Sequence, residues 1–172
     1  MLNVSEPTLG QEEKDALIEV IDSGWITAGE KVRKFEQEFA AMHGVEDAVA
    51  LSSCTAALHL ILLGLGLGAG DEVLVPAMTF AATANSVLYV GATPVFVDID
   101  SIDCPLMSLE DAAAKCTPRT KAIILVHYAG YLANKEEWQA FASRRGLMII
   151  EDAAHASGLK DAGSLGVAAA FS

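Results

Sequence analysis

Two neighbouring acidic residues followed by a histidine are the sharpest chemical feature of the sequence. Glu151 and Asp152 come directly after the apolar run 147–150, and His155 follows shortly afterwards. A carboxylate buried at the end of a strand must be paired with a positive partner or shift its pKa upward. The protonated ring nitrogen of a cofactor would be such a partner. A helix-capping aspartate with a surface histidine explains the same residues, and this segment alone leaves both interpretations open.

A second segment with the chemistry of a ligand site covers residues 52–57. Its sequence, Ser-Ser-Cys-Thr-Ala-Ala, is small and hydroxylated, and it runs directly into an apolar helical pattern. The amides of a helix start, together with a hydroxyl group, can hold a phosphate. The same residues are typical of an ordinary Ser or Thr helix cap, which this segment alone favours.

An aromatic residue follows another apolar run. Phe80 comes soon after the run 73–76, at the place where a strand would end. A planar ligand could stack on a ring in that position. A lone phenylalanine is more often part of a core, so stacking on a ligand is the more specific but less common of the two interpretations.

These segments need a sheet that brings them together, and the apolar pattern predicts one. We expect five strands, at residues 48–51, 72–75, 94–98, 122–126 and 147–150. We expect helices between and before them, at residues 11–23, 31–43, 55–63, 81–90, 108–115 and 134–145. Runs such as 73–76 and 122–126 are apolar at every position, which is typical of strands covered on both faces. The sequence therefore predicts an α/β fold with a mainly parallel sheet and helices on both faces. In such a sheet, ligands gather beyond the carboxyl ends of the strands.

Composition limits the classes of function. The chain has 172 residues, 52% of them hydrophobic, which suits one packed domain. Its formal net charge of -12 disfavours nucleic acid and anionic membranes as partners. The three cysteines form no CxxC pair, so we expect neither a disulfide framework nor a metal site, and a reduced, cytoplasmic setting fits best. The sequence contains no signal-peptide pattern and no apolar run long enough to span a membrane.

Taken together, the segments resemble the DegT/DnrJ/EryC1/StrS family of pyridoxal-phosphate (PLP) dependent sugar aminotransferases. The resemblance extends over nearly the whole chain. It rests on the order and spacing of Gly24-Trp-Ile-Thr-Ala-Gly29, Ser53-Cys-Thr-Ala-Ala-Leu58, Gly70-Asp-Glu-Val73, Thr79-Phe-Ala-Ala-Thr83, Gly91-Ala-Thr-Pro94, Val97-Asp-Ile-Asp100, Pro118-Arg-Thr-Lys-Ala122, Val126-His127 and Glu151-Asp-Ala-Ala-His-Ala156. The resemblance implies the large domain of the fold type I aminotransferase architecture.

The resemblance also implies roles for individual residues. Contacts to PLP are implied for Thr55, for the amide of Ala56, for Phe80, Asp152, His155 and Ser172. Thr55, Ala56 and Ser172 would contact the phosphate, and Phe80 would stack on the pyridine ring. Asp152 would pair with the pyridinium nitrogen, and His155 would face the phenolic oxygen. Trp25, Thr27 and His127 are weaker candidates for the substrate side of the pocket. Relatives usually carry glycine where Cys54 stands, which is a departure at the phosphate turn.

The implied reaction moves an amino group, typically from glutamate, onto a keto group of a nucleotide-linked sugar, in a homodimeric enzyme. The Schiff-base lysine of such an enzyme would follow Phe171-Ser172 by a few residues. None of Lys14, Lys31, Lys34, Lys115, Lys121, Lys135 and Lys160 lies in that motif. We therefore expect no catalytic lysine within residues 1–172, and little or no transamination by these residues alone.

The expected organisation is a helical arm and active-site-edge segment at residues 1–30, followed by an incomplete PLP-binding large domain at residues 31–172, without a carboxy-terminal small domain. Two other functions stay open. The chain could bind cofactor or pair with another subunit without catalysis, or it could belong to a PLP-dependent sugar dehydratase of the same family, in which histidine replaces the lysine.

Overall fold

The computed structural model describes residues 7–172 and contains a five-stranded sheet in the order β2-β1-β3-β4-β5. Its strands are β1 (Glu72–Pro76), β2 (Thr93–Val97), β3 (Thr120–Val126), β4 (Met148–Ala153) and β5 (Ala168–Phe171). Every neighbouring pair of strands is parallel. All carboxyl ends of the strands therefore meet at one edge, where a ligand site is expected.

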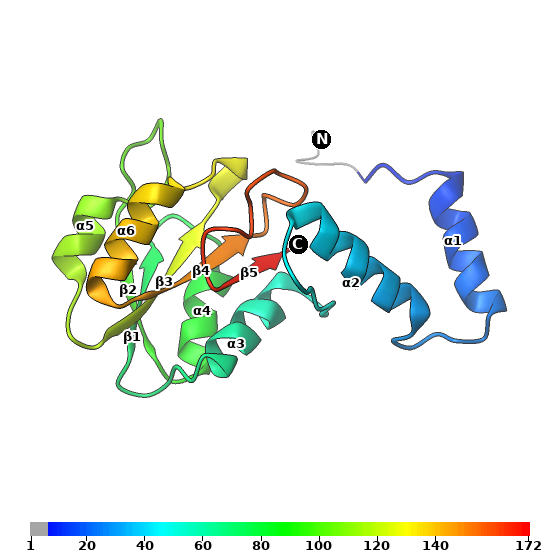
Figure 1. Ribbon diagram of the computed structural model, residues 1–172, viewed down its shortest axis with the longest axis horizontal. Helices are drawn as coiled ribbons and strands as arrows, with labels where there is room; N and C mark the ends of the chain where they lie inside the picture. The colour runs from blue at the N-terminus through cyan, green and yellow to red at the C-terminus, as the bar shows by residue number, and fades with distance from the viewer. Residues whose placement is uncertain (1–6) are drawn as a thin grey trace.

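Helices precede the sheet and alternate with its strands (Figure 1). They are α1 (Gln11–Asp22), α2 (Glu30–His43), α3 (Cys54–Gly64), α4 (Ala81–Tyr89), α5 (Leu109–Lys115) and α6 (Lys135–Arg145), with one 3₁₀ turn, η1 (Tyr128–Gly130), after β3. Each predicted helix is present. Ser108 and Asn134 cap α5 and α6 by accepting hydrogen bonds from the amides of Asp111 and Glu137, which explains where these two helices begin.

The sheet separates two layers of helix, as the apolar runs predict. Helices α3 and α4 cover one face, and α5 and α6 cover the other (Figure 1). Neighbouring residues of a strand point to opposite faces, and β4 shows this directly. Ile149 packs with Trp138 and Phe141 of α6, whereas Ile150 packs with Leu58 of α3. The α/β fold with helices on both faces is confirmed.

One predicted strand is wrong and one strand was not predicted. Residues 48–51 have an apolar, strand-like sequence but form no strand. A strand needs a hydrogen-bonded neighbour, and the amide of Ala50 donates instead to the Glu36 carboxylate at 2.8 Å. Strand β5, in contrast, is mostly alanine and lacks the β-branched residues that indicate strands. The strand forms because it pairs with β4, which its sequence alone does not indicate.

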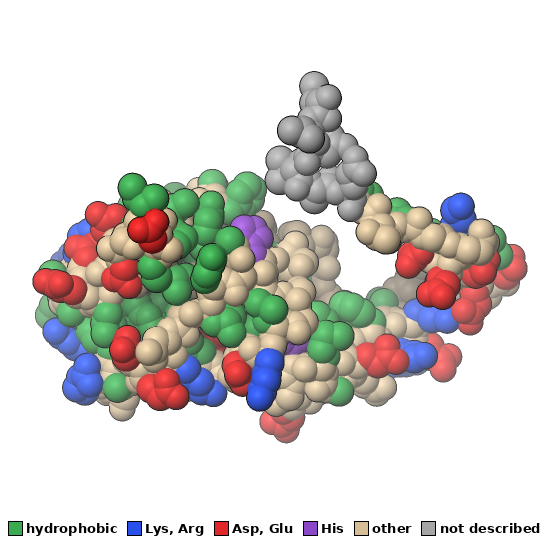
Figure 2. Space-filling view, turned by 90° about the horizontal axis from the view of Figure 1, so that it is seen from above, with side chains coloured by type: hydrophobic (Ala, Val, Ile, Leu, Met, Phe, Trp, Pro, Cys, Tyr) green, Lys and Arg blue, Asp and Glu red, His purple; other side chains and the backbone are tan. Residues whose placement is uncertain are grey.

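The amino-terminal part extends away from the layered body. Helix α1 has no buried residue, and Figure 1 shows it at the far end of the arm that α2 begins. The inner end of α2 contacts the sheet through Phe39 and His43, whose rings lie 5.1 and 4.4 Å from the Phe171 ring. Acidic side chains are prominent on the arm in Figure 2. Residues 1–6 of the predicted arm lie outside the described residues. No helix in residues 7–172 is long and apolar enough to cross a membrane.

Candidate functional site

The Asp152 carboxylate lies near the carboxyl end of β4, on the face covered by α3 and α4, and is 5% exposed. Its Oδ2 atom accepts a hydrogen bond of 2.7 Å from the hydroxyl of Thr83, a fully buried residue of α4. Its Oδ1 atom lies 3.8 Å from Cys54 Sγ and 3.4 Å from the amide of Ala154. The carboxylate is thus oriented by one strong donor and two long contacts. Sequence reasoning did not identify Thr83 individually, because residues 83 and 152 are far apart in the chain.

Helix α3 begins next to this carboxylate, at the segment in which phosphate contacts were predicted. Ser53 caps the helix, and its hydroxyl accepts a hydrogen bond of 3.1 Å from the amide of Ala56. The ordinary helix cap is therefore present. Thr55 and Ala56 lie in the first turn of α3, where backbone amides point out of the helix start. Cys54 is the first residue of the helix, and it joins this turn to Asp152.

Phe80 lies at the start of α4, four residues after β1 ends. Its side chain is 76% exposed, so it does not belong to the core. The core interpretation of Phe80 is thereby excluded for this structure. An exposed ring immediately beyond a strand end is available to a planar ligand.

His155 lies just beyond β4 and is exposed. Its Nδ1 atom accepts a hydrogen bond of 3.2 Å from the amide of Ala129, and its ring packs edge-on against Tyr128 at 5.8 Å. Since Nδ1 accepts, the proton of the neutral ring resides on Nε2. His155 can therefore donate a hydrogen bond from Nε2 to an oxygen atom.

His127 and Glu151 form a second cluster, on the opposite face of the sheet from Asp152. The His127 Nε2 atom lies 2.8 Å from Glu151 Oε2, and the two residues are 1% and 0% exposed. The amide of Ala133 donates to His127 Nδ1 at 3.3 Å, so both ring nitrogens are engaged within the chain. His127 thus presents no free polar atom to a substrate in this structure.

The Glu151 carboxylate also holds the loop before β5. It accepts hydrogen bonds from the amides of Gly163, Leu165 and Gly166 at 2.9, 2.7 and 3.0 Å. Burial by itself raises the pKa of Glu151, but the hydrogen bonds from His127 and the three amides outweigh it, so the pKa lies below its ordinary value. Glu151 therefore stays charged at neutral pH. This role was not predicted, although the acidic pair that contains Glu151 was the sharpest feature of the sequence.

Trp25 and Thr27 are not brought to Asp152. They belong to the loop between α1 and α2, at the outer end of the arm (Figure 1). Trp25 is 64% exposed, and its indole donates to the carbonyl oxygen of Ala28 at 3.2 Å. Within a single chain these two residues are separated from the strand ends by the length of α2.

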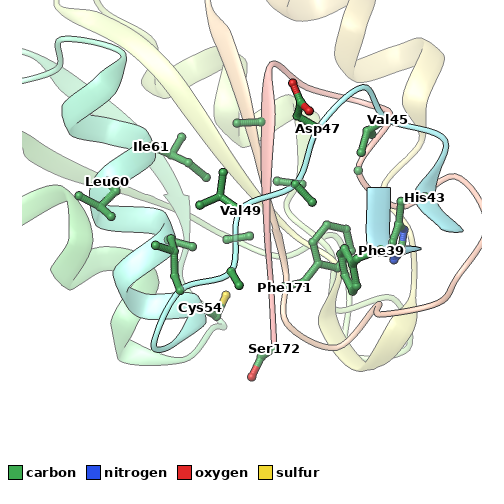
Figure 3. A pocket seen from close by; sticks show the side chains of 18 of the residues that line it. Phe39, His43, Val45, Asp47, Val49, Cys54, Leu60, Ile61, Phe171 and Ser172 are labelled. Carbon is green, nitrogen blue, oxygen red and sulfur yellow. The ribbon is translucent and has the colours of Figure 1, made fainter. Parts of the chain in front are cut away.

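A cavity of about 850 Å³ lies along the free edge of β5, between that strand and the segment that joins α2 to α3. Figure 3 shows Phe39, His43 and Phe171 at one side of it and Cys54 and Ser172 at another. Asp152, Phe80 and His155 do not line it. The cavity therefore borders the strand-end site at Cys54 and Ser172 and is otherwise separate from it. Among residues 7–172, no group of His, Cys, Asp and Glu could hold a metal ion.

Known proteins are similar to the chain in sequence and in fold. The chain is 45% identical over 177 residues to the spore coat polysaccharide biosynthesis protein SpsC of Bacillus subtilis (strain 168), covering 99% of the chain and 45% of SpsC. The aminotransferase from Psychrobacter cryohalolentis matches 96% of the chain and 43% of its own length, with 38% identity and a TM-score of 0.91.

The PLP-form of Spr1654 from Streptococcus pneumoniae, a protein assigned as a sugar aminotransferase, matches 99% of the chain at 32% identity and a TM-score of 0.93. The chain covers 48% of that structure, so it spans less than half the length of these relatives. A model of the DegT/DnrJ/EryC1/StrS aminotransferase family matches residues 7–172. With its parallel sheet and its carboxylate at the end of β4, the chain belongs to the DegT/DnrJ/EryC1/StrS aminotransferase family.

Proposed function

We propose that the whole protein is a PLP-dependent aminotransferase that moves an amino group, typically from glutamate, onto a keto group of a nucleotide-linked sugar. The observation that carries this proposal is the buried Asp152 carboxylate, which Thr83 holds at the edge where the strands end. Family membership and the likeness to SpsC, a polysaccharide biosynthesis protein, support a sugar substrate.

The residues at this edge fit PLP. Asp152 offers a carboxylate whose Oδ1 atom has only long contacts, at 3.4 and 3.8 Å, so it can accept a further N–H donor. Phe80 offers an exposed ring, and α3 offers a helix start for an anionic group. The negative phosphate and the cationic ring of the cofactor thus each have a matching group. When bound, PLP supplies an electron sink for the substrate carbanion.

Each residue then has a defined task. Asp152 would hold the protonated ring nitrogen, which is the form in which the ring withdraws electrons. Phe80 would pack against the ring, and His155 would donate from Nε2 to the phenolic oxygen. Thr55 and Ser172 would bind the phosphate together with the amide of Ala56, which would have to exchange its hydrogen bond to Ser53 for one to the ligand.

Two further statements are part of the proposal. The protein acts as a homodimer, which would give Trp25, Thr27 and the exposed apolar residues of α1 a partner surface. It works in the cytoplasm, where the free thiols of Cys54, Cys104 and Cys116 would stay reduced. His127 is better explained as the partner of Glu151 than as a substrate contact.

The test compares three chains. Residues 1–172 alone should show little or no transfer from glutamate to a keto sugar, because none of their lysines lies in the Schiff-base motif. A positioned base that transfers the proton contributes roughly 10² to 10⁴ to the rate. A chain extended through the following lysine and the small domain should be active with PLP. The same extended chain with that lysine changed to alanine should not. Robust turnover by residues 1–172 would contradict the proposal.

A further inference from the structure

The two oxygens of the Asp152 carboxylate have unequal partners. Oδ2 receives a hydrogen bond of normal length from the Thr83 hydroxyl, at 2.7 Å. Oδ1 has the Cys54 thiol at 3.8 Å and the Ala154 amide at 3.4 Å. A thiol is a weak donor, and an amide at 3.4 Å is beyond the usual range for a strong bond. Oδ1 is therefore the oxygen with capacity for a stronger donor.

Thr83 is itself held in place. Its hydroxyl lies 2.7 Å from the Thr79 hydroxyl, and its side chain is fully buried on α4. A hydroxyl has one proton, and Thr83 donates it to the carboxylate, so Thr79 must donate to Thr83. Thr79, just before α4, and Thr83 on α4 thus form a directed chain of hydrogen bonds that ends on Oδ2. This chain fixes the rotation of the carboxylate and the direction in which Oδ1 points.

Cys54 is suited to a reversible contact. Burial, followed by the nearby negative charge of Asp152, raises the pKa of its thiol to about 12. The thiol therefore stays protonated at neutral pH and can donate to Oδ1. Because that bond is long and weak, a charged N–H group would replace it readily.

We propose that Thr83 is a positioning residue that fixes Asp152 through Oδ2, and that the Cys54 thiol is a replaceable occupant of Oδ1, the oxygen that receives the ring N–H of PLP. This inference rests on the proposed function, because it assigns the ring nitrogen to Asp152. It assigns different functions to the two carboxylate oxygens, and it assigns roles to Thr83 and Cys54.

The first test measures binding of pyridoxamine 5'-phosphate to the 172-residue chain by fluorescence. This probe has an amine in place of the aldehyde of PLP, so it forms no covalent bond with surface lysines. Thr83→Val removes the hydroxyl at nearly constant volume and should weaken binding about tenfold or more. Thr83→Ser keeps the hydroxyl and should restore binding. Ser86→Ala is the matched control, since Ser86 is equally buried on α4 but its hydroxyl donates to the Thr83 carbonyl.

Cys54→Ala removes the occupant of Oδ1 and should tighten binding by about threefold, because no thiol contact is then lost. Circular dichroism verifies that each variant folds. Thr83→Ala replaces Thr83→Val in the comparison if the valine variant does not fold.

A second measurement needs no cofactor. In a chain with Cys104→Ser and Cys116→Ser, the only thiol is Cys54, and its reaction with an aromatic disulfide reagent at pH 8 should be slow. Adding Asp152→Asn removes the negative charge beside the thiol and should speed the reaction about tenfold or more. An unchanged rate would show that the thiol does not contact the carboxylate, and would overturn the assignment of Cys54.

The outcomes separate this inference from the proposed function. If the wild-type chain does not bind the probe, or if Asp152→Asn binds it as well as wild type, the proposed cofactor site fails and the inference fails with it. If Asp152→Asn loses binding while Thr83→Val matches Ser86→Ala, the cofactor site stands and the positioning role of Thr83 is wrong. Weaker binding by Thr83→Val that Thr83→Ser restores, with tighter binding by Cys54→Ala, is the result we expect.

Discussion

The imidazole of His127 donates a hydrogen bond to the Glu151 carboxylate across the paired ends of β3 and β4, with 2.8 Å between Nε2 and Oε2. The direction follows from the other ring nitrogen, which accepts the amide proton of Ala133. A neutral histidine therefore faces a charged glutamate in a place that water does not reach. The negative charge is balanced by this ring and by three amides of the loop before β5.

Glu151→Gln should destabilise the fold strongly. The carboxylate accepts four hydrogen bonds from the chain, whereas the NH₂ group of glutamine cannot accept any and would face donors. Breaking a buried charged network from one side costs about 3 to 5 kcal/mol. Urea unfolding followed by circular dichroism measures the loss. Glu46→Gln, at an exposed position, is the control and should change stability by less than about 0.5 kcal/mol.

Lowering the pH should destabilise the fold through protonation of Glu151. The pKa of Glu151 in the folded chain lies below its ordinary value of 4.5, so the folded state binds a proton at this site less readily than the unfolded state. Its stabilising contribution is complete above the unfolded pKa and is lost as the pH falls through the folded pKa. As the pH falls below about 5, the wild-type chain should therefore lose more stability than Glu151→Gln. Parallel pH profiles of the two chains would contradict this.

Gly166→Ala should also destabilise the chain, for a steric reason. A Cβ atom at this position would overlap the carbonyl oxygen of Ile149, which is backbone and cannot rotate away. The backbone would have to move, which would also disturb the hydrogen bond from the Gly166 amide to the Glu151 carboxylate. We expect a loss of about 2 to 3 kcal/mol in thermal or urea unfolding. Gly64→Ala, at a helical position with open space around it, should be neutral or slightly stabilising.

Asp152→Ala should weaken PLP binding in any form of the protein that contains the following lysine. The change leaves the protonated ring nitrogen without its partner, at a cost of roughly 3 to 5 kcal/mol, or more than about a hundredfold in affinity. Absorbance titration with PLP measures the effect. Asp103→Ala, at an exposed carboxylate, should leave the affinity unchanged. Wild-type affinity and turnover in Asp152→Ala would show that the pocket is wrongly assigned.

Residues 1–172 should self-associate through the arm. Leu17 and Ile21 of α1 are 65% and 68% exposed on a helix that buries no residue within the chain. Changing both to serine should weaken association at least about tenfold, since burying each such side chain contributes about 1.5 to 3 kcal/mol. Light scattering across a range of concentrations measures it. Lys14→Ser on the same helix is the control, and a monomeric wild-type chain at high concentration would contradict the prediction.

Most of the fold could be predicted from the sequence because its signals are local. Strands β1 and β3 contain the continuous apolar runs 73–76 and 122–126, and the helices have clear periodicity and caps. Asp152, Phe80 and the start of α3 could also be singled out, since each lies within four residues after an apolar run. The structure confirms the parallel sheet, in which segments that follow the strands lie at one edge.

The features that escaped prediction all depend on pairing between distant segments. The Ala-Ala-Ala-Phe sequence of β5 becomes a strand because β4 lies beside it, and residues 48–51 do not because the described chain gives them no neighbour. The hydrogen bond from Thr83 to Asp152 joins residues 69 positions apart. Nothing in the sequence around Thr83 distinguishes it from an ordinary helix threonine.

The alternation of side chains along β4 has a consequence for how this sequence can change. Glu151 faces the loop before β5, and Asp152, its neighbour, faces α3 and α4. Substitutions around Asp152 can therefore alter the proposed ligand site while the hydrogen bonds between Glu151 and the loop before β5, on the other face, stay intact. Insertion or deletion of one residue within β4 cannot be tolerated in the same way, because it would exchange the two faces and move both carboxylates from their partners at once. Along this strand, point substitutions at one face can accumulate over evolution, whereas the spacing must be kept.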